Sequence, residues 1–196
     1  PKTYADAKAY AEGLSYNGQQ GYLVTITSAE ENDFVYNLLR GHGDHSQMAW
    51  LGASDNAVES EWVWEAGPET GQHFWTGYQW GVNGEYGDGA TENGGYANWA
   101  LDHLSPPELV GGLEEDYAVM STHDAGNYYP GGQWMDSAFT ATASAGGNDN
   151  VNQFVIEYGG QESIIIPGSS GTSGTAEIPG TPGTPADIVA YVDGAE

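Results

Sequence analysis

The segments AWLGAS (Ala49 to Ser54) and EWVWE (Glu61 to Glu65) decide how this chain is expected to fold. Each is a short apolar run that contains Trp, and Asp, Asn, Ser and Glu residues separate the two runs. This pattern predicts short antiparallel strands joined by loops. Three later runs have the same character and are also predicted to be strands: DYAVMS (Asp116 to Ser121), GQWMDS (Gly132 to Ser137) and NQFVIEYG (Asn152 to Gly159).

Two helices are predicted before these strands. The first begins at Thr3, has apolar residues at helical spacing and ends near Gly13. Ser28 and Glu31 have the spacing of a capping box at the start of a second helix, which Gly41 closes. A β-branched run between the helices predicts a further strand, GYLVTIT (Gly21 to Thr27).

Long segments of low periodicity surround the predicted strands. The segment from Glu65 to Trp99 is rich in Gly and is predicted to be an ordered loop held by its aromatic residues. The composition shifts after Tyr158 to Gly, Ser, Thr and Pro. We therefore expect one domain over residues 1–160, followed over residues 161–196 by a linker with a strand-like C-terminal tail.

The charge of the chain limits its partners. There are 28 acidic and 3 basic residues, with a formal net charge of −25, which repels nucleic acid and anionic lipid headgroups. The acidic excess suits bound divalent cations or a salt-rich medium, and equally a merely soluble acidic surface. No apolar run is long enough to predict membrane insertion, and there are no cysteines. With no Ser-His-Asp order, phosphate loop or cofactor motif, we expect no enzyme.

The order of these motifs resembles the C-type lectin-like domain, in particular the cysteine-free form found in bacterial extracellular proteins. The resemblance covers roughly Thr3 to Gly160 and includes WLGA (Trp50 to Ala53), YANW (Tyr96 to Trp99) and GQWMD. It implies an α+β fold with two helices, short antiparallel sheets and a long loop region. It also implies a secreted or cell-surface protein that binds calcium and, as lectin members do, a sugar coordinated to that calcium.

The resemblance implies a ligand set for calcium. The family site takes its ligands from a Glu-Pro-Asn type motif, from a Glu before the next strand and from a Trp-Asn-Asp motif. In this chain the matching positions hold Glu108 in the first motif, the pair Glu115 and Asp116, and Asp136 in the last motif. Met135 stands where the Asn of the last motif belongs. The implied set therefore has carboxylates but lacks neutral amides.

The implied partner is a glycan or a cell-surface polysaccharide, and the implied function is glycan recognition or adhesion. The predicted sugar contacts are Glu108, Glu115, Asp136 and Tyr128, the last because a flat aromatic face in a Gly-rich loop can stack on a sugar ring. Two alternatives stay open. Asp136 could cap a turn beside a buried Trp134, and the loop aromatics could serve only to anchor their loops.

The tail suggests a second function. Family members begin with a strand that pairs with the last strand of the domain, whereas this chain begins directly at a helix cap, so the last strand is predicted to have an open edge. Donation of the tail to the next subunit would join copies head to tail into a filament or surface layer, and the alternative is that the tail folds back on its own domain. The residues predicted to take part in this self-assembly are Ile188, Val189, Tyr191 and Val192.

Overall fold

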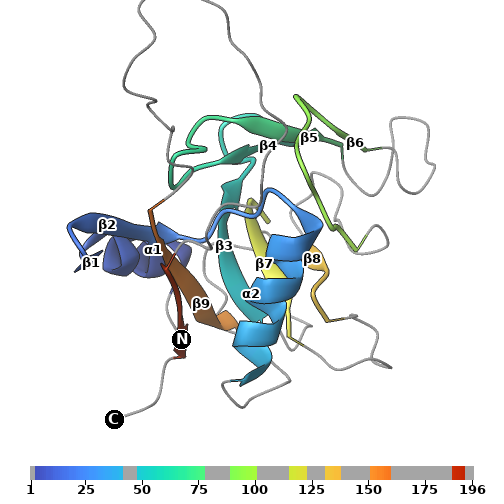
Figure 1. Ribbon diagram of the computed structural model, residues 1–196. Coiled ribbons are helices and arrows are strands. Elements are labelled where there is room, and N and C mark those ends of the chain that lie inside the picture. Colours follow the sequence, from blue (N-terminus) through green and yellow to red (C-terminus); the bar gives the residue numbers. More distant parts are fainter. Residues whose placement is uncertain are drawn as a thin grey trace, which may run out of the picture.

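The computed structural model describes residues 3–41, 48–77, 89–100, 115–122, 131–137, 151–159 and 187–192 (Figure 1). Its described helices are α1 (Tyr4–Glu12) and α2 (Ala29–Gly41). Its described strands are β1 (Ser15–Tyr16), β2 (Gln19–Leu23), β3 (Met48–Ser54), β4 (Glu61–Trp64), β5 (His73–Thr76), β6 (Ala90–Thr91), β7 (Tyr117–Ser121), β8 (Trp134–Ser137), β9 (Val151–Tyr158) and β10 (Asp187–Val192). The predicted α+β fold with two helices is confirmed.

β9 lies at the centre of the sheet, although it follows nearly all the other strands in the sequence. β2 pairs antiparallel with the C-terminal half of β9, and β3 pairs in parallel with its N-terminal half. From β3 the sheet continues through β4, β5 and β6, while β7 also pairs with β3 and β8 pairs with β7. The parallel β3 and β9 pair corrects the expectation of purely antiparallel strands. Parallel neighbours need a crossover connection, and here the crossover contains β4 to β8.

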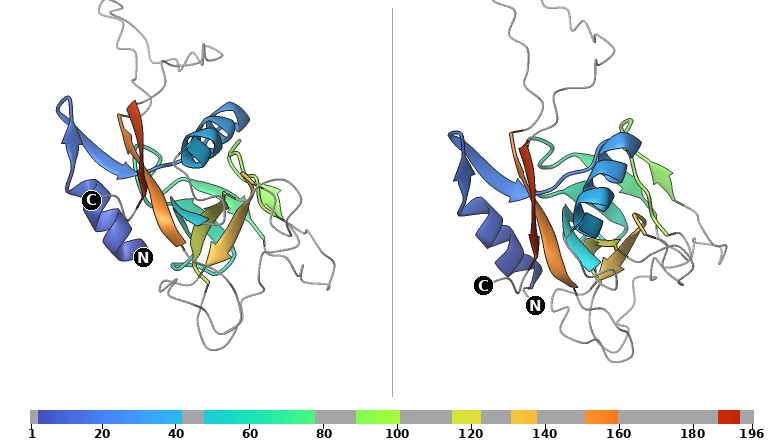
Figure 2. Two further views of the ribbon diagram at one scale, coloured as in Figure 1. Left: turned by 90° about the horizontal axis from the view of Figure 1, so that it is seen from below. Right: turned by 60° about the horizontal axis from the view of Figure 1, so that its bottom comes forward.

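Two hydrophobic cores lie on opposite faces of β3 and β9. The α2-side core contains Leu39, Leu51 and Val155, and the α1-side core contains Trp50 and Phe154, each of them at most 1% exposed. All residues of β3 are buried, because each face of the strand lines one of these cores. Figure 2 shows α1 and α2 on opposite sides of these strands. The domain is thus layered as α1, central sheet and α2.

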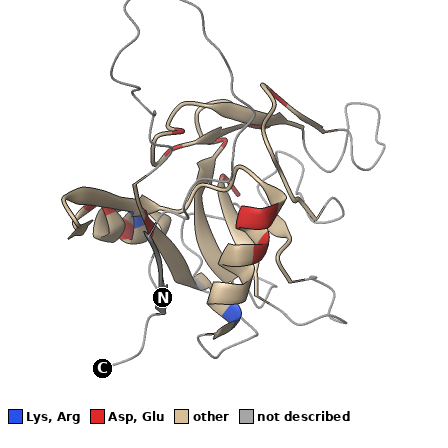
Figure 3. Ribbon diagram, viewed as in Figure 1, with Lys and Arg blue, Asp and Glu red and all other residues tan. Residues whose placement is uncertain are grey.

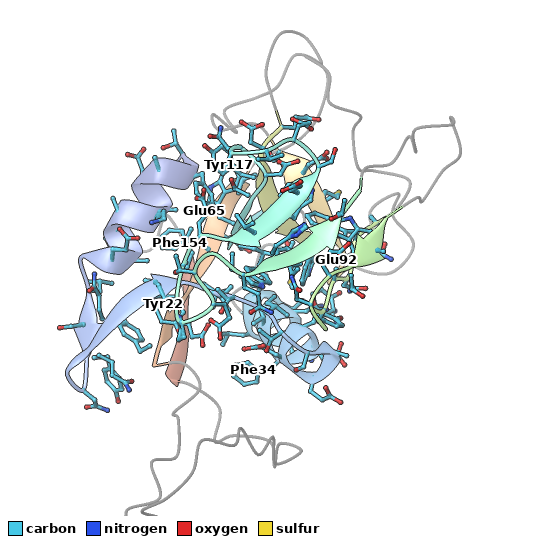
Figure 4. The ribbon with its side chains drawn as sticks, turned by 90° about the horizontal axis from the view of Figure 1, so that it is seen from above. Tyr22, Phe34, Glu65, Glu92, Tyr117 and Phe154 are labelled. Atoms are coloured by element: carbon cyan, nitrogen blue, oxygen red, sulfur yellow. The ribbon has the colours of Figure 1, made fainter. Side chains whose placement is uncertain are left out.

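Aromatic contacts hold α1 to the sheet. The rings of Tyr4 and Tyr117 lie 4.2 Å apart, and Tyr10 meets Phe154 edge-on at 5.9 Å. The Tyr4 hydroxyl donates to a carboxylate oxygen of Glu65 at 3.1 Å. Figure 4 shows Glu65 and Tyr117 close to the start of α1. Both ends of the helix are therefore tied to strands that lie far from it in the sequence.

The predicted helix starts are confirmed, with one difference at α2. Thr3 Oγ1 accepts a hydrogen bond from the backbone N–H of Asp6 (3.1 Å), and Ser28 Oγ accepts one from the N–H of Glu31 (3.1 Å). A capping box would return the Glu31 carboxylate to the N–H of Ser28. Instead it accepts from the N–H of Thr27 at 2.7 Å. Glu31 is thereby fixed beside the segment that follows β2.

Other expectations need correction or lie outside the described residues. The segment between Glu65 and Trp99, predicted to be a loop, contains the strands β5 and β6. Phe74 of β5 is buried and stacks on Trp64, which holds β5 against β4. The strand predicted over residues 21–27 ends at Leu23. The domain boundary near residue 160 and the linker over 161–186 lie outside the described residues. In the described ranges, no helix has the length and apolar character needed to cross a membrane.

Candidate functional site

β7 and β8 bring predicted calcium ligands to one end of a strand pair. Ala118 of β7 is opposite Asp136 of β8. Asp116 comes just before β7 and two residues before Ala118, near the end of the strand pair that carries Asp136. Glu115 adjoins Asp116 and is half-buried, as is Asp136. Glu108 and Tyr128 lie outside the described residues.

Asp116 is anchored to the turn after β3. Its side chain is 7% exposed, and Oδ2 accepts a hydrogen bond from Asn56 Nδ2 at 2.7 Å. Its backbone carbonyl accepts from the N–H of Asp55 at 3.2 Å. The turn therefore sets the position of the Asp116 carboxylate.

A second buried carboxylate lies beside Asp116. Asp55 is 4% exposed, and its Oδ2 accepts from the N–H of Ser60 at 2.9 Å, while Oδ1 has no hydrogen-bond partner. The pKa of Asp55 is raised to about 7, chiefly by burial and also by the charges of Glu59 and Asp116, although the hydrogen bond from Ser60 acts in the opposite direction. This end of β7 therefore holds negative charge that hydrogen bonds only partly offset.

The position of the family's amide is part of the hydrophobic interior. Met135 is 3% exposed, lies opposite Val119 and belongs to the α1-side core. Its neighbour Asp136 therefore faces the opposite side of the strand pair. Trp134 is fully buried, and its indole N–H donates to Asn32 Oδ1 at 2.7 Å. The motif thus keeps its buried Trp and its acid, whereas an apolar residue replaces the amide.

A second acidic group, which the sequence analysis missed, lies between β9 and the turn after β4. Glu157 of β9 is 4% exposed, and its Oε2 lies 3.4 Å from Thr25 Oγ1 and 3.3 Å from the Thr25 backbone N. Thr25 Oγ1 donates to Glu69 Oε2 at 2.9 Å. Two carboxylates therefore meet at one hydroxyl.

Burial raises the pKa of Glu157 to about 7. A hydrogen bond with Tyr22 opposes that shift, and the charges of Glu31 and Glu69 add to it. Burial also raises the pKa of Glu31. The basic residues of the described helices lie elsewhere, with Lys8 on α1 paired to Glu12 and Arg40 at the end of α2 (Figure 3).

One sequence signal could have revealed part of this group. Glu157 interrupts the apolar run FVIEY in a strand whose described side chains are all buried, and an ionisable residue in such a run needs a partner. Glu69 has no comparable signal, because it lies in a turn far from Glu157 in the sequence. In the part of the chain that is described, no three His, Asp or Glu side chains are grouped closely enough to hold a metal ion.

Comparison with models of protein families identifies the family of this domain. The model of the C-type lectin domain matches residues 1–100, which span both helices and the strands up to β6. The chain belongs to the C-type lectin domain family. The predicted family is therefore confirmed.

Relatives of this C-type lectin domain come from distant organisms. Halomucin of Haloquadratum walsbyi is 33% identical over 158 residues, which cover 81% of this chain and 1% of halomucin. Lithostathine of Rattus norvegicus is 32% identical over 92 residues, covering 46% of this chain and 56% of lithostathine. The chain thus spans about half the length of lithostathine and a small fraction of the length of halomucin.

Solved structures with a similar arrangement include other C-type lectins. An EPNH mutant of CEL-I is 22% identical with a TM-score of 0.47, and the match covers 71% of this chain and 77% of that chain. The carbohydrate-recognition domain of the human scavenger receptor C-type lectin is 23% identical with a TM-score of 0.41, over 70% of this chain and 74% of that chain.

Proposed function

We propose that this C-type lectin domain is a calcium-dependent glycan-binding module that acts outside the cell, in recognition or adhesion. The observation that carries the proposal is the register of β7 and β8, which places the start of β7, with Glu115 and Asp116 just before it, beside the part of β8 that carries Asp136. Family membership supports the glycan, and the donor chemistry supports the calcium. The role we propose is binding rather than catalysis.

The donor set fits calcium. This ion takes about six to eight oxygen ligands and prefers carboxylates and carbonyls. Glu115, Asp116 and Asp136 offer carboxylate oxygens at one end of the β7 and β8 pair, although these three side chains are not grouped closely enough to hold the ion by themselves. One oxygen of Asp116 is already held by Asn56. A cation at this end of β7 would offset the charge on Asp116 and on the buried carboxylate of Asp55. When bound, calcium would supply coordination positions for sugar hydroxyls.

The buried Met135 limits which sugars such a site would select. In the family site, amides and acids also bond the sugar hydroxyls that approach the metal, and Met135 offers no such group and is turned into the α1-side core. Selection would then depend on Glu108, Glu115, Asp136 and Tyr128. We therefore expect a preference unlike the usual mannose or galactose recognition.

Calorimetric titration of calcium into chelator-treated protein tests the proposal. We expect binding in the micromolar to millimolar range, weakened about tenfold or more in Asp136→Asn and in Glu115→Gln. Asp33→Asn, at an exposed position of α2, removes the same charge and should leave binding unchanged. Glycan screening with and without calcium then tests the ligand. Calcium affinity that survives both site changes would refute this location.

A second calcium position is favoured by the acidic pair at Thr25. Calcium bound between Glu69 and Glu157 would offset the cost of burying the Glu157 charge and would join β9 to the turn after β4. Its role would be structural, because binding to the folded state alone raises stability. Glu157→Gln should then remove one component of calcium binding and leave the sugar preference intact. Equal calcium binding by Glu157→Gln and the unaltered protein would refute this second position.

A further inference from the structure

β10 covers one edge of β9 from Gln153 to Tyr158. Its residues pair with β9 in unbroken antiparallel register, from Asp187 opposite Tyr158 to Val192 opposite Gln153. The other edge of β9 is occupied by β2 and β3 in succession. Figure 2 shows the dark red β10 alongside the orange β9.

Without β10, the central strand of the domain would have an open edge. Phe154, Val155 and Ile156 are at most 1% exposed, so this part of β9 belongs to the hydrophobic interior. An unpaired edge presents a row of backbone N–H and C=O groups, which is a template for another strand. In the structure β10 of the same chain pairs along this edge, which is the fold-back arrangement that the sequence analysis kept as the alternative to donation.

The connection between the two strands is far longer than their pairing needs. Antiparallel neighbours can be joined by about two to five residues, whereas residues 159–186 separate β9 from β10. Gly, Ser, Thr and Pro make up most of this segment, and a flexible linker of about 28 residues has a root-mean-square span on the order of 30 Å. Connectivity therefore does not oblige β10 to pair with the β9 of its own chain.

We propose that β10 is exchanged between copies of this chain, so that the β10 of one copy pairs with the β9 of another in the same register. This inference goes beyond the proposed function and does not depend on it. The strand pairing is the same within and between copies. One-way donation would join copies head to tail, and reciprocal exchange would close a dimer.

Protein concentration sets the balance between pairing of β10 within its own chain and exchange of β10 between chains. A tether of this span holds β10 near its own β9 at an effective concentration on the order of 10 mM. At about 0.1 mM protein, exchanged copies should then amount to roughly 1% of the chains, and the fraction should rise in proportion to concentration. Exchange would dominate only where many copies are held close together.

The absence of cysteines permits a direct test. Val155 and Ala190 are opposite each other, within the reach of a disulfide. Chains carrying only Val155→Cys are mixed with chains carrying only Ala190→Cys, refolded together and oxidised at several concentrations. We expect a heterodimer joined by the 155–190 disulfide, about tenfold more abundant for a tenfold rise in concentration. Mixing Val155→Cys with Ala90→Cys, at an exposed position of β6, measures random crosslinking.

A chain that carries both Val155→Cys and Ala190→Cys completes the design. It should form an internal disulfide as a monomer and lose the ability to exchange. Heterodimer no more abundant than the Ala90→Cys control would overturn the proposal if this double variant closes its internal bond, because β10 would then be confined to its own chain. Failure of the internal bond to form would overturn it as well, because the register would be wrong. Calcium titration of the double variant reports separately on the proposed function.

Discussion

Replacement of Glu157 by Gln tests the physical reasoning about the acidic pair most directly. Glu157 is 4% exposed and has a pKa of about 7, against 4.5 for the ordinary side chain. Below about pH 4.5 the carboxyl is protonated in both the folded and the unfolded state. Between that pH and about 7 the unfolded state loses its proton first, so the folded state is progressively disfavoured. The loss is complete above about pH 7.

The magnitude follows from the shift. One pKa unit corresponds to about 1.4 kcal/mol, so the Glu157 charge should cost about 3 kcal/mol of unfolding free energy above pH 7. Glu157→Gln has no such charge, although its amide is similar in size. We expect the stability of the unaltered protein relative to this variant to fall by about 3 kcal/mol between about pH 4 and pH 8. Asp55 is present in both proteins, so its titration cancels in the difference.

Urea unfolding at a series of pH values, in chelator and at constant salt, measures this difference. Asp33→Asn serves as the exposed control and should track the unaltered protein at every pH. Saturating calcium at about pH 8 should restore most of the lost stability if calcium binds between Glu69 and Glu157. A stability difference that does not vary with pH would show that the buried Glu157 charge is compensated in some other way, and the reasoning would fail.

Three further predictions concern strain, packing and charge. Ser60→Gly should raise the unfolding free energy by about 1 kcal/mol, because Ser60 has a φ of 69° and a buried hydroxyl without a partner; a lower urea midpoint would contradict this. Met135→Asn should lower stability by about 2–4 kcal/mol without adding sugar binding in a glycan screen, because the amide would enter the α1-side core; a stable variant that gains a sugar ligand would contradict this. The melting temperature should rise between about 0.1 and 1 M NaCl, because the screening length falls from about 10 to 3 Å in a chain of charge −25; an unchanged value would mean that self-repulsion is unimportant.

The elements that the sequence predicts well carry their signals locally. Thr3 and Ser28 cap their helices with hydrogen bonds to residues three positions later, so the cap and its partner can be read together. The Trp-containing runs form strands because their Trp side chains are buried in one or the other of the two cores. β5 was missed because its apolar pair, Phe74 and Trp75, lies among Gly and polar residues.

The features that the sequence does not reveal depend on long-range register. Nothing local indicates that β9 lies parallel to β3, because the crossover between them takes in most of the domain. The meeting of Glu69 and Glu157 at Thr25 likewise joins three distant segments. The face of Met135 depends on its pairing with Val119. Motif order could identify the amide position but could not show that it is turned into the α1-side core.

The central place of β9 also governs when this domain can fold during synthesis. The ribosome makes residues 151–158 after all the other elements of the two cores. Until they emerge, the α1-side core lacks Phe154 and Ile156, and the α2-side core lacks Val155. We therefore expect the nascent chain to remain open and accessible to chaperones until its last core strand is released, and then to close both cores in a single cooperative step.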